Sequence, residues 1–148
     1  MTAPATFARH NPVTGVLASS APAMTVGEAR AAADRAAAAF PAWSVLGPNA
    51  RRALLTKAAD ALAARANDFV AAMMGEIGAT EGWARFNVGL AVGMVREAAA
   101  LTTQIGGEVI PSDKPGCIAM ALREPVGVIL GIAPWNAPVI LGVRAIAV

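Results

Sequence analysis

The sequence contains one cysteine, one histidine and few charged residues. Because Cys117 has no second cysteine to pair with, an internal disulfide and a zinc site built from several cysteines are excluded. We predict no metal site. Only 15% of the residues are charged, against about 25% in an average soluble domain. This apolar composition indicates either a membrane protein or a chain that buries part of its surface against something outside these residues.

Basic residues are few and scattered. Twelve Lys and Arg residues stand against ten Asp and Glu residues, which gives a net charge of +2, and only Arg51 and Arg52 are adjacent. No basic block alternates with aromatic residues, so nucleic acid is not an expected partner. Residues 1–25 lack the charged start and apolar core of a signal peptide. Together with the single cysteine, this favours a cytoplasmic location.

The apolar segment 126–148 is nearly long enough to cross a membrane, and Arg144 is its only charged residue. Glycine and proline residues interrupt it, and Trp135 and Asn136 are flanked by two prolines, which is typical of a loop. We therefore predict no membrane helix here. A small membrane protein anchored by this segment is an alternative that detergent extraction would test.

The first hundred residues predict a hairpin followed by helices. Residues 7–21 alternate loosely around an Asn-Pro-Val-Thr-Gly turn, which favours a β-hairpin. Thr25 with Glu28 three residues later predicts a capped helix start, and Pro41 is expected in the last turn of that helix. Two further helices are predicted over 49–74 and 80–105, each ended by glycines.

The pattern changes after residue 106. Short extended stretches are predicted at 108–110 and 117–123. The continuous apolar run 126–132 is typical of a strand buried on both faces, as in a parallel sheet. A loop at 134–138 and a helix from Val139 follow. Strand, loop and helix make the first half of a βαβ unit, whose ligands bind at the carboxyl ends of the strands. The predicted fold class is therefore α/β.

Asn136 is the most informative residue of this loop. Pro134 and Pro138 restrict the backbone on either side of it. A fixed asparagine amide at a strand end can donate a hydrogen bond to a developing oxyanion, and one such donor stabilises the transition state by about 3–4 kcal/mol in a well-studied hydrolase. A loop asparagine is also a common turn former, so the spacing alone leaves both roles open.

Two segments carry a resemblance to a known family. Residues 124–128, Glu-Pro-Val-Gly-Val, and 131–138, Gly-Ile-Ala-Pro-Trp-Asn-Ala-Pro, resemble the aldehyde dehydrogenase family. The turn at 11–15, the helix at 50–63 and the step at 106–111 are similar to the same family at matching spacing. The resemblance implies that the chain is a portion of an enzyme that oxidises an aldehyde to an acid with NAD or NADP.

The family fold assigns each part of the chain a place. Residues 1–148 would be a single incomplete N-terminal portion of the domain, a truncated aldehyde dehydrogenase fold. Its helices would occupy 25–106, and strands at about 108–124 would belong to a β element through which subunits associate as a homodimer or homotetramer. Residues 126–148 would begin a Rossmann-like NAD-binding domain as strand, loop and helix. A non-catalytic module that binds a partner subunit through the 117–123 strand is the alternative function.

The resemblance also implies roles for residues. In this family a cysteine thiolate attacks the aldehyde, hydride passes to the nicotinamide, and a glutamate activates the water that hydrolyses the thioester. Both residues would lie beyond residue 148, so the chain alone is predicted to be inactive. Cys117 is not that nucleophile, since the single histidine, His10, is far away in sequence. Asn136 would be the oxyanion donor. The cofactor, NAD or possibly NADP, would be held by Ile132, Ala133, Pro134, Trp135 and Asn136.

Several residues indicate an aromatic substrate. Ala137 stands where the family often has phenylalanine, which opens space for a flat aldehyde. Trp83 could stack on an aromatic ring, and Arg144 could bind a phenolic oxygen, although a packing role for Trp83 and a solvated charge for Arg144 are the plainer readings. Residues 85–89 and 110–117 look most like the salicylaldehyde and vanillin branch, so we predict a hydroxybenzaldehyde such as salicylaldehyde. The predicted substrate-binding residues are Trp83, Leu90, Met94, Ala137, Ile140, Leu141 and Arg144.

Overall fold

A computed structural model describes residues 5–147 of the chain. It begins with an antiparallel hairpin of β1 (Thr6–His10) and β2 (Leu17–Pro22). The side chain of Asn11 accepts two backbone N–H groups of the turn, and Gly15 closes the turn with a φ of 70°. A positive φ suits glycine because it has no Cβ. The predicted hairpin is confirmed.

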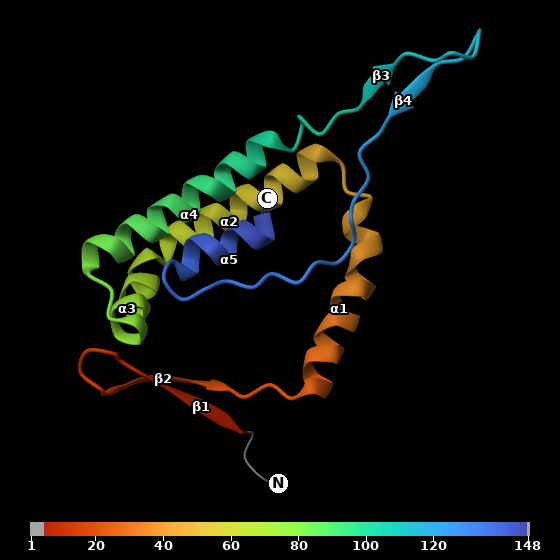
Figure 1. Cartoon of the computed structure of the whole chain (residues 1–148). Helices are drawn as coiled ribbons and strands as arrows, with labels where there is room; N and C mark the ends of the chain where they lie inside the picture. Colours follow the sequence, from red (N-terminus) through yellow and green to blue (C-terminus); the bar gives the residue numbers. More distant parts are fainter. Residues whose placement is uncertain (1–4, 148) are drawn as a thin grey trace.

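The first helix, α1 (Val26–Ser44), starts at the predicted cap. The Thr25 hydroxyl accepts the Glu28 N–H at 3.2 Å, and the Glu28 carboxylate accepts the Thr25 N–H at 2.7 Å. These bonds satisfy two N–H groups that the helix itself cannot pair. Pro41 lies in the last turn, as predicted, and no residue of α1 is buried. Figure 1 shows α1 standing beside the other helices.

The single helix predicted over 49–74 is wrong, because the structure has two helices there. They are α2 (Pro48–Ala64) and α3 (Ala66–Ile77), and the chain bends at Arg65, whose φ and ψ are −102° and 18°. Asn67 and Asp68, which follow the bend, are weak helix formers, and Asp68 instead pairs with Arg65 at 3.0 Å. The apolar stripe continues across the bend because both helices pack on the same neighbour.

That neighbour is α4 (Glu81–Leu101), which runs beside α2 in Figure 1. It packs against α2, α3 and the last helix, α5 (Pro138–Ala147). Small and β-branched side chains cover its buried face, which lets the helix axes approach closely. The buried residues of α4 are Ala84, Asn87, Val88, Ala91, Val92, Val95 and Ala99. The core therefore forms along one face of α4.

A second hairpin projects away from the helices (Figure 1). It consists of β3 (Glu108–Ile110) and β4 (Ala119–Ala121), which pair antiparallel. The observed β4 is shorter than the strand predicted over 117–123. Cys117 is an exposed free thiol in the loop of this hairpin. The hairpin has little contact with the helical core and depends on its own short ladder.

The buried strand predicted over 126–132 does not form in the described part of the chain. Residues 122–134 follow an irregular path, and Val126, Leu130 and Ile132 are 89%, 86% and 84% exposed. A strand needs a neighbour for its backbone N–H and C=O groups, and within residues 5–147 no strand pairs with this segment. The helix that follows is confirmed as α5. Among the described helices, none combines the length and apolar character needed to cross a membrane.

Candidate active-site loop

The candidate loop is a tight turn at Trp135 and Asn136, directly before α5. Ala137 is buried, and its carbonyl accepts the Leu141 N–H at 3.0 Å, which starts the helical hydrogen bonding. Pro138 opens the helix, where a missing N–H has no consequence and the fixed φ favours the helical backbone. The sequence around Asn136 therefore predisposes the chain to turn there and enter α5.

The helix α4 holds this turn at two points. The Trp83 indole Nε1–H donates to the backbone carbonyl of Asn136 at 3.1 Å. The Asn87 Oδ1 atom accepts the backbone N–H of Ile140, also at 3.1 Å. Trp83 and Asn87 are four residues apart and share one face of α4. Asn136 is exposed, and among residues 5–147 its side-chain amide has no hydrogen-bond partner. A turn held by hydrogen bonds to α4 thus presents an exposed amide donor.

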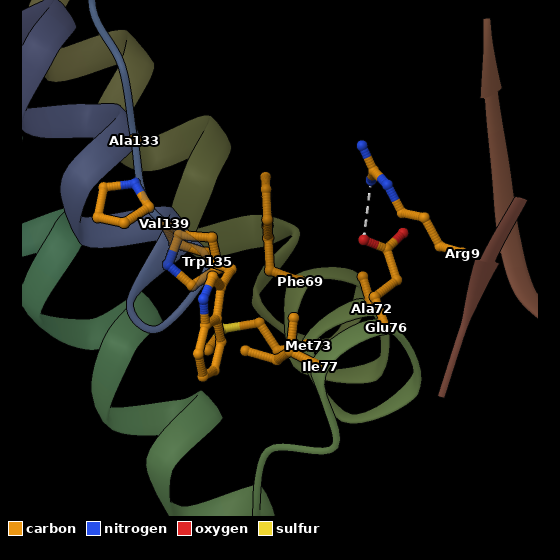
Figure 2. A pocket seen from close by; sticks show the side chains of 11 residues that line it. Arg9, Phe69, Ala72, Met73, Glu76, Ile77, Ala133, Trp135 and Val139 are labelled. Atoms are coloured by element: carbon orange, nitrogen blue, oxygen red, sulfur yellow. Dashed lines mark hydrogen bonds and ion pairs between the residues drawn. The ribbon is translucent and has the colours of Figure 1, made fainter. Parts of the chain in front are cut away.

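The residues predicted to bind the cofactor precede this turn. Ala133, Pro134 and Trp135 line a cavity of about 570 Å³ between the loop and α3. Figure 2 shows Trp135 and Phe69 at this cavity, with the ion pair of Arg9 and Glu76 at its edge. Ile132 is exposed and is not part of the lining. Asn136 is not part of the lining either, so the structure brings three of the five predicted cofactor residues to one cavity.

The residues predicted to bind the substrate divide into two groups. Ala137 and Ile140 are buried against Ala91 of α4, with Met94 and Leu141 packed beside them, so these four side chains pack between the helices. Trp83, Leu90 and Arg144 remain exposed. Arg144 is in the last turn of α5, where a positive charge interacts favourably with the helix dipole.

Trp83 is part of an aromatic surface beside the turn. Its ring stacks on Phe86 with a centroid separation of 5.5 Å and an interplanar angle of 25°. It is 43% exposed, so the indole retains area for another contact while its N–H is bound to Asn136. The Trp83 ring therefore packs against Phe86 on one side and keeps exposed area elsewhere.

Sequence reasoning missed Asn87. It is 0% exposed and is the largest fully buried side chain in the described part of the chain. The signal was present in the sequence, because Asn87 is a single amide on the otherwise apolar buried face of α4. Buried polar groups usually have a specific hydrogen-bond partner, and here the partner is the start of α5.

Comparison with known proteins places this loop in a family. The sequence model of the aldehyde dehydrogenase family matches residues 1–148. The chain is 61% identical over 142 residues to the vanillin dehydrogenase of Pseudomonas fluorescens, covering 96% of this chain and 29% of that protein. The chain belongs to the aldehyde dehydrogenase family.

Solved structures confirm the mixed helix and strand fold. The salicylaldehyde dehydrogenase of Pseudomonas putida G7, complexed with salicylaldehyde, has a TM-score of 0.93 at 45% identity, covering 97% of this chain and 30% of that one. An NAD-dependent benzaldehyde dehydrogenase of Corynebacterium glutamicum has a TM-score of 0.90 at 25% identity, covering 99% of this chain and 32% of that one. The chain thus spans about 30% of the length of these relatives, and the predicted resemblance to the vanillin and salicylaldehyde branch is confirmed.

Proposed function

We propose that these residues are the N-terminal part of an NAD(P)-dependent aromatic aldehyde dehydrogenase, in which Asn136 stabilises the oxyanion. One observation carries the proposal, which is the exposed Asn136 amide on a turn that two hydrogen bonds fix to α4. The 61% identity to a vanillin dehydrogenase supports the reaction class. In the overall reaction the aldehyde loses a hydride, water supplies the second oxygen, and a carboxylic acid forms.

The role of Asn136 follows from where charge develops. When a nucleophile adds to an aldehyde carbon, the carbonyl oxygen becomes negatively charged, and an amide N–H pointed at it lowers the barrier. Because the turn is already fixed by α4, little reorganisation is needed when the charge appears. Removing one such donor lowers kcat by about 10²- to 10³-fold in a hydrolase, and we expect a similar effect here.

The loop also fits a dinucleotide cofactor. Its exposed apolar side chains adjoin the cavity of about 570 Å³, which suits a flat and partly apolar ring. The nicotinamide, when bound, accepts the hydride from the aldehyde carbon. Solved relatives include NAD-dependent and NADP-dependent enzymes, so both cofactors are candidates. The residues proposed to hold the cofactor are Ile132, Ala133, Pro134, Trp135 and Asn136.

The aromatic substrate is proposed from the surface next to Asn136. The stacked rings of Trp83 and Phe86 offer a flat face for a benzaldehyde ring. Leu90 follows Trp83 by two turns on the same side of α4 and adds exposed apolar area. Arg144 is proposed to bind a phenolic oxygen. Relatives named for vanillin and salicylaldehyde support this substrate class.

The proposed mechanism needs two further catalytic groups, which we place in the sequence after residue 148. The nucleophilic cysteine and the general-base glutamate would be supplied there, so we expect the 148 residues alone to be inactive. Cys117 does not replace the nucleophile, because it lies in the projecting β3–β4 hairpin. A cytoplasmic homodimer or homotetramer is proposed for the longer protein.

A second candidate function is a subunit-interaction module. The β3–β4 hairpin exposes Ile118, Met120 and Leu122, at 79%, 60% and 71% exposure. An apolar hairpin that stands away from its own core is typical of a surface that binds a partner. In this reading the chain would bind a subunit without catalysis.

A chimera distinguishes these functions. It joins the 148 residues to the rest of the Pseudomonas fluorescens vanillin dehydrogenase, in place of the matching 29% of that protein. We expect the chimera to oxidise vanillin and salicylaldehyde with NAD, and we expect Asn136→Ala to lower kcat about 10²- to 10³-fold. Asn49→Ala, at an exposed asparagine of α2, is the matched control.

Two results would contradict the proposal. If Asn136→Ala leaves kcat unchanged, Asn136 is not the oxyanion donor. Equal catalytic efficiency on short aliphatic aldehydes and on salicylaldehyde would rule out the aromatic preference. A chimera that assembles into the normal oligomer but has no activity would favour the interaction module.

A further inference from the structure

Asn87 has an unusual environment. Its side chain is completely buried among the apolar residues of α4 and α5. Its Oδ1 accepts the Ile140 N–H, but its Nδ2 group has no hydrogen-bond partner among residues 5–147. A buried, unpaired amide N–H is unfavourable for folding. An apolar residue would fill this place without that penalty, so the hydrogen bond to Ile140 is the one contact among residues 5–147 that favours an asparagine here.

The start of α5 explains why that hydrogen bond matters. The first N–H groups of a helix have no acceptor within the helix, and a Ser, Thr, Asp or Asn side chain just before the helix usually supplies one. Here that residue is Ala137, which has no side-chain acceptor. Ile140 is buried, so water does not easily serve instead. Asn87 therefore caps α5 from another helix.

We propose that Asn87 is a positioning residue for the oxyanion donor. By capping α5 it fixes the backbone on one side of Asn136, while Trp83 fixes the carbonyl of Asn136 itself. The backbone from which the Asn136 side chain extends is then held by two side chains of one face of α4. Asn87 touches neither substrate nor cofactor in this role. The inference rests on the proposed oxyanion function of Asn136.

The kinetic test uses two variants of the chimera. Asn87→Leu has a similar size but no acceptor, while Asn87→Asp keeps an acceptor oxygen in either protonation state. We expect Asn87→Leu to lower kcat about 10- to 100-fold, the range that a small misplacement of a catalytic group produces, with KM nearly unchanged. Asn87→Asp should restore most of kcat. Thr102→Val is the control, because Thr102 is a buried polar residue at the far end of α4.

A double-mutant cycle separates positioning from general destabilisation. If Asn87 acts through Asn136, Asn87→Leu should lower kcat by less than about threefold in an Asn136→Ala background. The same loss in both backgrounds would overturn the inference, because Asn87 would then act independently of the oxyanion donor. Thr102→Val is expected to have equal effects in both backgrounds.

Amide hydrogen exchange provides a readout that does not depend on activity. Asn87→Leu should accelerate exchange of the Ile140 amide at least about tenfold, and more than that of Leu141, which bonds to the Ala137 carbonyl. Unchanged exchange at Ile140 would overturn the inference at any level of activity. If the parent chimera is inactive, or Asn136→Ala has no effect, the proposed function fails while the exchange result still decides whether Asn87 caps α5.

Discussion

Trp83 has two roles in this structure, and two substitutions separate them. Trp83→Phe keeps an aromatic ring but removes the Nε1–H that donates to Asn136 at 3.1 Å. Trp83→Leu removes both the donor and the flat ring that stacks on Phe86. The difference between the two variants therefore reports the stacking contribution, and the effect of Trp83→Phe reports the hydrogen bond.

The size of the hydrogen-bond effect can be estimated from its surroundings. A neutral intramolecular hydrogen bond contributes about 0.5–1.5 kcal/mol net. Trp83 is 43% exposed, so water can partly replace the lost donor and the lower half of that range applies. If the loss falls on the transition state, about 0.5–1 kcal/mol corresponds to a kcat lower by about two- to fivefold.

The assay is steady-state NADH formation by the chimera with salicylaldehyde and with a short aliphatic aldehyde. We expect Trp83→Phe to lower kcat for both substrates with little change in KM, because the turn loosens but the aromatic surface remains. Trp83→Leu should also raise KM for salicylaldehyde only. If Trp83→Phe leaves kcat unchanged with both substrates, the bond to Asn136 does not position the oxyanion donor.

Three further predictions concern stability. Met73→Ala should lower the free energy of unfolding by about 2–5 kcal/mol, because Met73 is 4% exposed and packs in the core. Chemical denaturation of the chimera measures this loss. Gly78→Ala should lower the free energy of unfolding by about 1–2 kcal/mol in the same assay, since Gly78 has a φ of 66° and an added Cβ would lie 3.1 Å from Pro12. An unchanged denaturation midpoint would contradict this. Hydrogen bonds from Thr25 lower the pKa of Glu28 below 4.5 in the folded state. Its stabilising contribution is therefore present above pH 4.5 and lost as pH falls through the lowered pKa. Amide exchange in the first turn of α1, corrected for the intrinsic rate, should rise over that range, and Glu28→Gln, which removes the titrating carboxyl, should abolish this dependence.

Local sequence signals predicted local structure well. The Asn11 turn and the Thr25 cap were predicted because each bond joins residues only two or three positions apart. The helix predicted from Val139, observed as α5, was likewise predicted from local sequence. The bend at Arg65 was missed because the apolar stripe continues through it, and a stripe reports which face is buried but not whether the axis is straight.

Features set by distant partners were not predictable in the same way. The apolar run 126–132 has the composition of a buried strand, but strand formation also needs a paired neighbour, and within residues 5–147 it has none. Asn136 was found from its loop and from the family resemblance. For Asn87 the sequence shows only an amide on an apolar helix face, and it does not show the hydrogen-bond partner, Ile140, which is 53 residues away.

The placement of the Asn136 turn on α4 has a consequence for the order of folding. Each of the two hydrogen bonds from α4, to Asn136 and to Ile140, joins residues that are 53 positions apart in the sequence. The helices α2, α3 and α4, in contrast, follow one another directly along the chain. Contacts between sequence neighbours generally form before distant ones. During synthesis, α2, α3 and α4 therefore leave the ribosome before the Asn136 turn does, and the turn can bind a surface that has already formed. The Asn136 turn would then be positioned by docking onto helices that have already formed.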